Sequence, residues 1–223
     1  MPTIFFTEKS CYVCQAKSRY PLINPSFSIV GPRDLDGRPS QIERASVYLW
    51  VQRCLECGYC APEIAQGNPS DCELITTDLY KKQLNCDQFP ETTNSFLCHS
   101  MLMENDGKLS DAGWAAVFGA WICDDNGFRD GAVICRKKAV SLFTKAIKNG
   151  ETFAENPDQQ KIYIIDLLRR ASDFDKALKL CDTELEKKDD NRELIDYFDF
   201  ERELVLKNDC SCHSDSTIEE MDY

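Results

Sequence analysis

The residues with the clearest chemical potential in this chain are two pairs of cysteines near its N-terminus. Each pair has the spacing Cys-x-x-Cys, with Cys11 and Cys14 forming the first pair and Cys54 and Cys57 the second. A turn of this kind presents two thiolates from one tight loop, and Zn²⁺ in structural sites takes four such soft ligands in a tetrahedron. The two pairs therefore predict one zinc site with all four cysteines as its ligands.

The separation of the two pairs is the unusual part of this pattern. Thirty-nine residues lie between Cys14 and Cys54, whereas zinc sites of this type commonly have roughly 15 to 20 between their pairs. The segment from Pro21 to Ser40 is punctuated by Pro and Gly, which predicts a loop. Because the entropy cost of closing a loop grows slowly with its length, a long insert remains compatible with a zinc site.

Two further groups of soft ligands lead to an alternative hypothesis. The segment Cys-Gly-Tyr-Cys at 57–60 has the spacing of a glutaredoxin-like redox dithiol, and Cys60 could also replace Cys57 as a metal ligand. Near the C-terminus, Cys210, Cys212 and His213 form a compact trio. The alternative is therefore a thiol redox or metal-sensing protein that uses the Cys57 and Cys60 pair or the C-terminal trio.

The composition is that of an ordinary globular protein. The 223 residues are 43% hydrophobic and 29% charged, which is enough to bury a core. The first ten residues lack the basic region and apolar segment of a secretory signal, and no apolar run is long enough to cross a bilayer. We therefore expect a cytoplasmic protein without membrane contact. The odd number of cysteines, thirteen, favours metal ligands and buried hydrophobic residues over a disulfide framework.

Charge divides the chain into two unequal parts. Residues 1–68 have a formal charge of +1, and residues 69–223 have a formal charge of −13. The second part would repel a polyanion, which disfavours nucleic acid as a partner of the whole chain. A contact between nucleic acid and the nearly neutral first part remains open.

The elements that must position the cysteines change character along the chain. β-Branched and aromatic residues predict strands at Thr3–Phe6 and Ser46–Gln52, with turns at Gly31-Pro32 and Asp36-Gly37 between them. From about residue 70 the hydrophobic period becomes helical. The predicted helices are Ser70–Asn85, Glu91–Glu104, one capped by Ser110-Asp111, Arg129–Lys148, Pro157–Ala171, Asp173–Lys187 and Asn191–Lys207.

Small and aromatic residues recur in the helical part with the spacing of a tetratricopeptide repeat. Ala139, Phe143 and Ala146 fall at i, i+4 and i+7, and Ala177 follows Ala139 after 38 residues, close to the repeat length of about 34. The pattern predicts helical hairpins that approach closely. The second unit is degenerate, since Cys181 stands at its aromatic position. A plain helical bundle is the alternative architecture.

The helical part offers little sign of catalysis. It has no phosphate-binding loop, no G-x-G-x-x-G and no H-E-x-x-H motif, and His99 and His213 are the only histidines of the chain. We interpret the stripe of Trp114, Phe118 and Trp121 as core, and the acidic pair at 124–125 as a solvated helix end. The sequence therefore gives no support to an enzymatic function.

Three motifs in order carry a resemblance to a known family. Arg-Asp-Leu-Asp at 33–36 lies between the cysteine pairs, Cys-Leu-Glu-Cys-Gly-Tyr follows at 54–59, and Ala-Trp-Ile-Cys lies at 120–123. Over roughly residues 8–187 this order resembles a bacterial family of unassigned function, with a zinc-ribbon-like region followed by tetratricopeptide-like helices. The resemblance implies a zinc role for the four cysteines of the two pairs and brings no known activity. This chain departs from the family's pattern at Tyr12 and Leu55, where proline is usual, and at Gln15, where glycine is usual.

The sequence thus predicts an α+β fold that is mostly α. A zinc-ribbon-like module occupies residues 1–68, a tetratricopeptide-like helical domain occupies residues 69–208, and residues 209–223 form a flexible acidic tail. The predicted function is non-enzymatic. We expect Zn²⁺ to stabilise the first module and a groove of the helical domain to bind an unknown peptide or partner protein.

Overall fold

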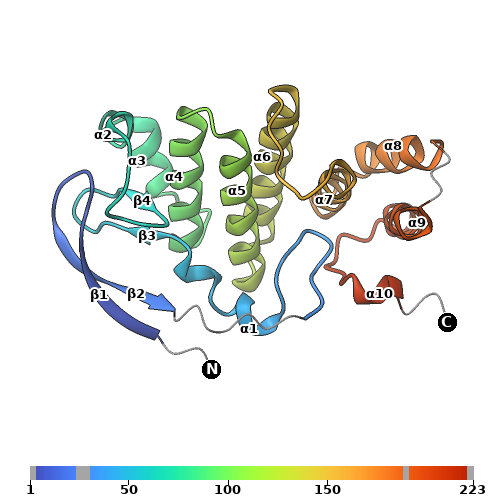
Figure 1. Ribbon diagram of the computed structural model, residues 1–223, viewed down its shortest axis with the longest axis horizontal. Helices are drawn as coiled ribbons and strands as arrows, with labels where there is room; N and C mark the ends of the chain where they lie inside the picture. The colour runs from blue at the N-terminus through green and yellow to red at the C-terminus, as the bar shows by residue number, and fades with distance from the viewer. Residues whose placement is uncertain (1–3, 24–30, 188–190, 220–223) are drawn as a thin grey trace.

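Two small β-hairpins come first in the chain, and a row of packed helices follows them (Figure 1). This computed structural model describes residues 4–23, 31–187 and 191–219. The arrangement confirms the predicted fold class, a mostly α protein with a small N-terminal β region. The tetratricopeptide-like repeat itself stays a prediction.

The hairpins place the two cysteine pairs in their turns. Strand β1 (Ile4–Ser10) pairs antiparallel with β2 (Lys17–Ile23), from Ile4 opposite Ile23 to Ser10 opposite Lys17. Strand β3 (Gln52–Arg53) pairs antiparallel with β4 (Cys60–Ala61). The described part of the predicted strand Thr3–Phe6 lies within β1, and residue 3 lies outside the described residues.

The prediction of a strand at Ser46–Gln52 is wrong. A 3₁₀ helix, η1 (Val47–Leu49), occupies the middle of the segment, and β3 begins only at the segment's last residue. The buried apolar residues of this segment are Val47 and Val51. Their separation by four positions suits a helical turn, whereas a half-buried strand would bury every second residue.

The helices from residue 91 onward lie where the sequence predicts them, with ends shifted by a few residues. The predicted helix Ser70–Asn85 is instead two helices, because Thr77 caps a new helix by accepting a hydrogen bond from the amide of Tyr80. No described helix is long and apolar enough to cross a membrane. The helices are α1 (Gln41–Arg44), α2 (Pro69–Leu74), α3 (Asp78–Leu84), α4 (Glu91–Asn105), α5 (Leu109–Asp125), α6 (Arg129–Lys148), α7 (Pro157–Arg170), α8 (Phe174–Leu185), α9 (Arg192–Leu206) and α10 (Ser216–Glu219).

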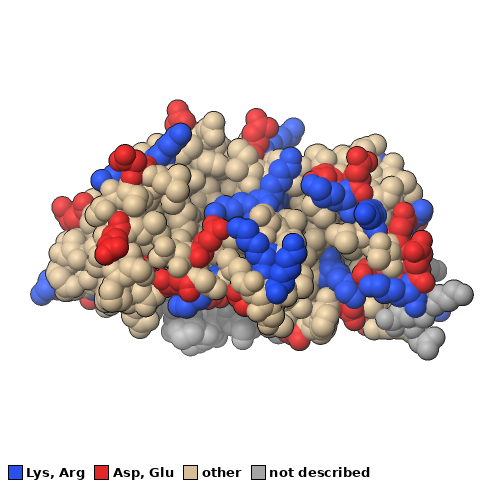
Figure 2. Space-filling model, turned by 90° about the horizontal axis from the view of Figure 1, so that it is seen from above, with Lys and Arg blue, Asp and Glu red and all other residues tan. Residues whose placement is uncertain are grey.

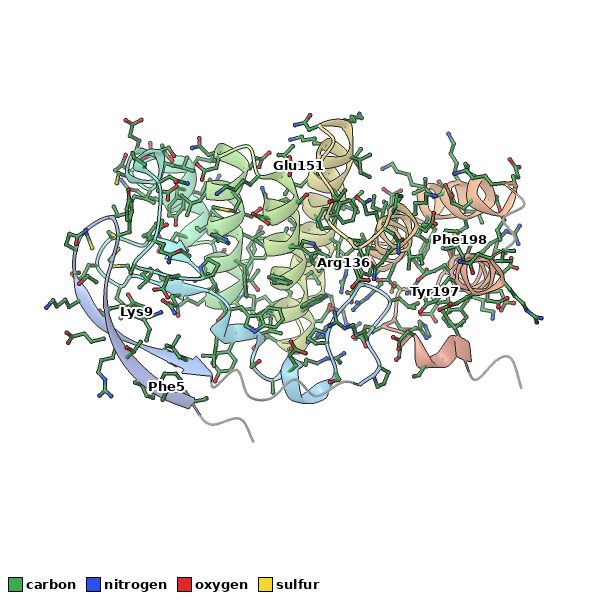
Figure 3. All side chains as sticks on the ribbon, in the orientation of Figure 1. Phe5, Lys9, Arg136, Glu151, Tyr197 and Phe198 are labelled. Carbon is green, nitrogen blue, oxygen red and sulfur yellow. The ribbon has the colours of Figure 1, made fainter. Side chains whose placement is uncertain are left out.

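Helices α4 to α9 pack in chain order, each against the next. In Figure 1, α4, α5 and α6 stand side by side, and α7, α8 and α9 continue the row in other orientations. One core cluster extends from Cys11 and Cys54 in the hairpins to Phe143 in α6 and Leu167 in α7. A second cluster joins α7, α8 and α9 around Phe198, which is labelled in Figure 3.

The segment between the hairpins lies against the C-terminal end of the array. The predicted turn at Asp36-Gly37 is confirmed, since Gly37 has a φ of 78° and its amide donates to the carbonyl of Asp34 at 2.8 Å. Leu35 is buried in a small cluster with Phe200 and Ile218. This loop therefore belongs to the same packed body as the helices.

The chain from residue 209 to 219 is docked on the body, where the sequence predicts a flexible tail. Asp34 and Ser214 form an isolated antiparallel bridge, and the amide of Leu35 donates to the carbonyl of His213 at 3.0 Å. Arg169 donates to the carbonyls of Asp209 and Ser211, both at 2.8 Å. Backbone hydrogen bonds of this kind carry no signal in side-chain composition, which is why the polar sequence looked like a free end.

Candidate functional site

The four cysteines of the two predicted pairs lie together at the tips of the hairpins. Their sulfur atoms are all within 4.8 Å of one another. The Sγ atoms of Cys11 and Cys57 are 3.7 Å apart, and those of Cys14 and Cys54 are 3.5 Å apart. Four sulfurs at about 2.3 Å from a tetrahedral zinc are about 3.8 Å from each other. The cluster therefore has the donor set and the dimensions of a structural zinc site.

The two turns that present these thiols have the same backbone geometry. In the first, the amide of Cys11 donates to Ala16, and the amide of Gln15 donates back to Cys11, both at 2.9 Å. In the second, the amide of Cys54 donates to Tyr59 at 2.8 Å, and the amide of Gly58 donates back to Cys54 at 2.9 Å. Gln15 and Gly58 occupy equivalent positions, with φ of 62° and 79°. Gln15 thus takes the left-handed conformation that glycine adopts most readily, and Gly58 fills the same position in the second turn.

Contacts between the hairpins hold the two turns against each other. The amide of Tyr12 donates to the carbonyl of Ile64 at 2.9 Å, and Lys9 pairs with Glu63 at 2.5 Å. Cys11 and Cys54 are buried in the main core, Cys57 is half-buried, and Cys14 is exposed. The cluster therefore packs against the main core through Cys11 and Cys54, and its exposed thiol is that of Cys14.

The environment of the thiols affects their protonation in opposite directions. Burial raises the pKa of Cys11 and of Cys57. Burial also raises the pKa of Cys54, but hydrogen bonds from the amides of Cys57 and Glu56 outweigh it, and the net pKa is lowered. Several thiolates at these distances repel one another. A divalent cation would remove that repulsion, so the cluster favours ionised thiols when a metal is bound.

Cys60, the second cysteine of the overlapping Cys-x-x-Cys motif, lies apart from this cluster. Its side chain is 0% exposed, and its thiol donates to the carbonyl of Gly58 at 3.3 Å. Cys57, by contrast, belongs to the four-cysteine group. The structure thus places Cys57 among the candidate ligands and Cys60 in the core.

The C-terminal trio does not gather into a ligand set. Cys210 and Cys212 are exposed, and Nε2 of His213 lies 3.0 Å from both Asp209 Oδ2 and Ser211 Oγ. Within the described ranges, the two hairpin turns contain the one group of three or more Cys, His, Asp or Glu side chains spaced for a metal.

Sequence reasoning missed a buried charge network around Asp36. This residue is 1% exposed and accepts hydrogen bonds from the indole of Trp121 at 2.8 Å and from Arg170 at 2.5 Å. Asp124 in turn pairs with Arg170 at 2.7 Å and with Arg136. Burial opposes ionisation of Asp36, but Arg170 and Arg136 outweigh it and lower the pKa of this carboxyl.

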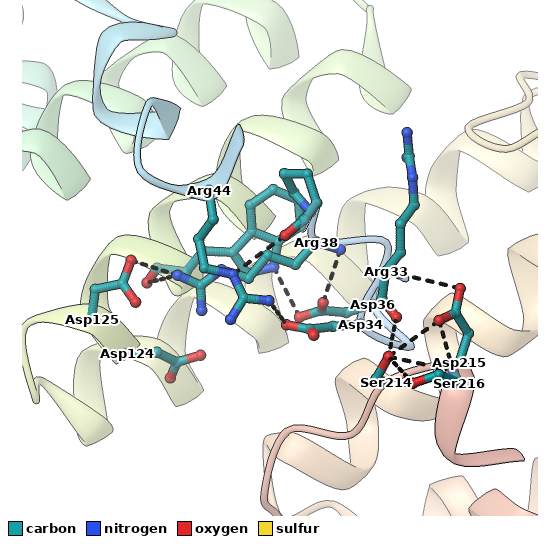
Figure 4. A network of polar contacts seen from close by, with 12 residues as sticks. Arg33, Asp34, Asp36, Arg38, Arg44, Asp124, Asp125, Ser214, Asp215 and Ser216 are labelled. Carbon is teal, nitrogen blue, oxygen red and sulfur yellow. Dashed lines mark hydrogen bonds and ion pairs between the residues drawn. The ribbon is translucent and has the colours of Figure 1, made fainter. Parts of the chain in front are cut away.

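The acidic pair at 124–125 is therefore not simply a solvated helix end. Asp125 pairs with Arg38 at 2.5 Å, and Asp34, two residues before Asp36, pairs with Arg44 (Figure 4). The pairs Arg38–Asp125 and Asp36–Arg170 fasten the loop before α1 to α5 and α7, and the pair Asp34–Arg44 joins this loop to α1. The sequence features that drew attention to this loop were the motif Arg-Asp-Leu-Asp at 33–36 and the turn predicted at Asp36-Gly37, and neither indicated buried ion pairs.

Two adjoining cavities lie between this loop and the helices. The acidic cavity has a volume of about 300 Å³ and the aromatic cavity about 560 Å³. They share four lining residues, Arg33, Gly37, Gln159 and Tyr163. The aromatic side chains that line the aromatic cavity are Trp50, Trp114, Phe118, Trp121, Phe153 and Tyr163.

The aromatic stripe on α5 is core only in part. Trp121 is buried, as predicted, but Trp114 and Phe118 are partly exposed and face the aromatic cavity. Trp50, which the sequence placed in a strand, follows η1 and packs edge-on against Phe118 with ring centroids 5.1 Å apart. The cavity therefore combines residues from α5, from the loop after α6 and from the segment before β3.

Comparisons with known proteins assign this chain to no family. A scan of protein-family models and searches of functionally described proteins and of solved structures each find no match to this chain. The structure by itself supports one description, a mostly α protein with a four-cysteine cluster in an N-terminal β region. The family resemblance of its motifs remains a resemblance.

Proposed function

We propose that this protein is a zinc-stabilised protein-interaction module with no catalytic role for its metal. The observation that carries the proposal is the cluster of four thiols on two matching turns. Cys11, Cys14, Cys54 and Cys57 would hold the ion, and four protein ligands leave no coordination position for a substrate. The bound ion would supply folding free energy, because the ligands are brought together only in the folded chain.

The arrangement of the helices supports the interaction part of the proposal. Consecutive helices pack on one another, and the small and aromatic positions of the repeat pattern are buried. These positions are Ala139, Phe143, Ala146, Ala177 and Cys181. Small residues at a helix interface let two helices approach closely, and stacked hairpins of this kind form extended binding surfaces. We interpret α5 to α8 as two tetratricopeptide-like hairpins.

The zinc part is tested by measuring metal content together with thiol reactivity. Untagged, freshly purified protein should contain one zinc per chain. Adding a strong chelator should make about four more thiols reactive toward a thiol reagent, because each Zn²⁺ in a closed site has four thiolate ligands. Protein without metal, or with metal whose removal exposes no thiols, would rule out this centre.

The interaction part is tested by selection from a random peptide library. Zinc-loaded protein should enrich a set of related sequences, and synthetic peptides with these sequences should bind at one site. If no sequence is enriched over a blank surface, the proposal of a peptide-binding groove is wrong.

The redox alternative has less support in the geometry. A redox dithiol needs an accessible thiol of low pKa, whereas Cys60 is buried and burial raises the pKa of Cys57. Alkylation of the metal-free protein at mildly acidic pH separates the hypotheses. Rapid modification of Cys57, followed by formation of a disulfide with Cys60 under mild oxidation, would favour the redox function.

A further inference from the structure

The walls of the aromatic cavity are held rigidly by the protein itself. The indole N–H of Trp114 donates to the carbonyl of Phe153, and that of Trp121 donates to Asp36, both at 2.8 Å. The rings of Trp114 and Tyr163 meet at 80°, and those of Trp50 and Phe118 at 81°. Because these indole N–H groups are already bonded, Trp114 and Trp121 offer ring surface rather than hydrogen-bond donors to a ligand.

Carboxylates lie at the edge of this aromatic surface. Glu43 and Glu155 line the aromatic cavity, and neither side chain has an ion-pair partner within the described part of the chain. The adjoining acidic cavity is lined by four more acidic residues, and Arg33 is the basic residue of the joint lining. These four residues are Asp34, Asp158, Glu193 and Asp215. Asp34 and Asp158 are ion-paired with Arg44 and Lys161, so Glu193 and Asp215 remain for a ligand.

Basic side chains lie both next to the two cavities, where they are ion-paired with acidic residues, and on another part of the surface. Figure 2 shows Lys and Arg concentrated over the middle of the face seen from above, where α6 lies in Figure 1. Helix α6 has several exposed lysines, among them Lys137, Lys145 and Lys148. In Figure 4 the side chain of Arg33 extends away from the hydrogen-bonded network around it. The two cavities together form an acidic and aromatic trough.

We propose that this trough binds a basic peptide and that the aromatic cavity receives one of its Lys or Arg side chains. The face of an aromatic ring carries a negative quadrupole and attracts cations, most strongly when carboxylates lie nearby and water is partly excluded. The rings and the two glutamates provide both conditions. This assignment deepens the proposed interaction function and rests on it.

A peptide fits the trough better than a small organic cation. The two cavities share four lining residues, so an occupant of one can continue into the other. A small cation would occupy only part of the aromatic cavity, which has a volume of about 560 Å³, and would leave the acidic one unused. A chain with two basic residues can place one against the rings and the second near Glu193 and Asp215 of the acidic cavity, which matches the charge of both.

Tryptophan fluorescence reports directly on this site, because the three tryptophans of the chain all line the aromatic cavity. The probe is acetyl-Gly-Lys-Gly-Arg-Gly-amide, and its neutral counterpart carries acetyl-lysine and citrulline at the two basic positions. We expect a saturable change in emission with the basic peptide that weakens as salt is added. The neutral peptide should bind at least about tenfold more weakly, since it lacks both cations.

Substitution of the two glutamates localises the interaction. Glu43→Gln and Glu155→Gln should each weaken binding of the basic peptide about two- to fivefold, the effect of removing one exposed charge from an ion pair. Glu73→Gln makes the same change in charge at an exposed position on α2 outside the trough. This control variant should bind the peptide as the unsubstituted protein does.

Three other results of the fluorescence titration would each contradict a different part of the inference. If the neutral peptide binds as tightly as the basic one, recognition of a cation is wrong while peptide binding stands. If tetramethylammonium changes the emission and neither peptide does, the site takes a small cation and not a peptide. If no probe changes the emission, the inference fails, and the library selection decides separately whether the proposed interaction function fails with it.

Discussion

At the scale of single residues, the two cysteine turns differ at the position that follows the second cysteine. Both positions have positive φ, which costs a residue with a side chain roughly 1–2 kcal/mol and costs glycine little. Gly58 occupies this position in one turn and Gln15 in the other. The comparison gives a direct test of how much each turn depends on glycine.

We predict that Gly58→Ala lowers the free energy of unfolding by more than about 1 kcal/mol, through the strained φ and a clash. A Cβ atom at this position would lie 2.4 Å from Cδ2 of Leu84. Gln15→Gly should change stability by less than about 1 kcal/mol, because relief of strain is offset by greater freedom of the unfolded chain. Urea unfolding of the zinc-loaded proteins measures both. Equal effects of the two substitutions would contradict the explanation.

The candidate ligands themselves are tested by replacing one buried thiol. Cys54→Ser should abolish stoichiometric zinc binding and lower the melting temperature, because zinc has a strong preference for thiolate over hydroxyl. Cys72, on α2, is exposed and outside the cluster, so Cys72→Ser is the matched control. Metal analysis and calorimetry on both variants provide the measurement. Full zinc occupancy in the Cys54 variant would exclude it as a ligand.

The four cysteines were predictable from the sequence, whereas Asp36 was not. A Cys-x-x-Cys pair is a local signal whose chemistry is encoded within four residues, and two pairs suffice to suggest one site. Asp36 instead acquires its role from Arg170, which is far away in the chain. One aspartate in a loop looks solvated until its distant partner is known.

At the scale of elements, the predicted bounds of a helix agree with the structure where local sequence signals determine its ends. Asn156 accepts a hydrogen bond from the amide of Gln159 at 2.8 Å, and Pro157 opens α7. Both features are readable from the sequence. The segment Ser46–Gln52 was misread because its aromatic and β-branched residues have strand propensity, whereas packing against the core selects a 3₁₀ turn.

A second buried charge cluster links α7 to α9. Arg169 donates to Asp166 at 2.5 Å and to Glu201 at 2.7 Å, and all three side chains are buried. Asp166 Oδ2 and Glu201 Oε1 are buried without a hydrogen-bond partner among the described residues. Burial raises the pKa of both carboxyls, that of Glu201 to about 8. Since two carboxylates share one guanidinium, we infer that Glu201 is protonated at neutral pH.

This cluster predicts a loss of stability as pH rises. The pKa of Glu201 in the folded protein, about 8, lies above the value of about 4.3 expected in the unfolded chain. Protonated Glu201 thus contributes fully to the free energy of unfolding below the pKa of this residue in the unfolded chain. This contribution is lost as the pH rises through its pKa in the folded protein. Between pH 5 and 8, we expect the free energy of unfolding to fall by up to about 1.4 kcal/mol per pH unit relative to Glu201→Gln.

Urea unfolding at several pH values in this range tests the assignment. The comparison uses the difference between proteins, because a metal bound to the four-cysteine cluster would add the same pH dependence to each of them. Glu203→Gln is the control, since Glu203 lies on the same helix but is exposed and paired with Lys207. Parallel pH profiles for the unsubstituted protein and Glu201→Gln would exclude Glu201 as the titrating group.

At the scale of the whole molecule, contacts distant in sequence join the predicted parts into one body. The main core includes Cys60 and Ile64 together with Phe96 and Trp121, so it crosses the boundary predicted at residue 68. The loop at 33–36 and the chain at 213–215 lie together across the C-terminal end of the array. Composition changes near residue 68, but shared packing is what decides whether two parts fold separately.

We therefore predict that residues 69–223 do not fold cooperatively on their own. This fragment would lack Asp36, leaving Arg170 with one of its two acidic partners, and breaking a buried ion pair costs about 3–5 kcal/mol. It would also lose Tyr59 and Ile64 from the core. Thermal unfolding followed by near-ultraviolet circular dichroism should show no sharp transition for the fragment. Adding separately prepared residues 1–68 with zinc should restore a transition, whereas a fragment that melts sharply by itself would establish the independent helical domain that the sequence predicts.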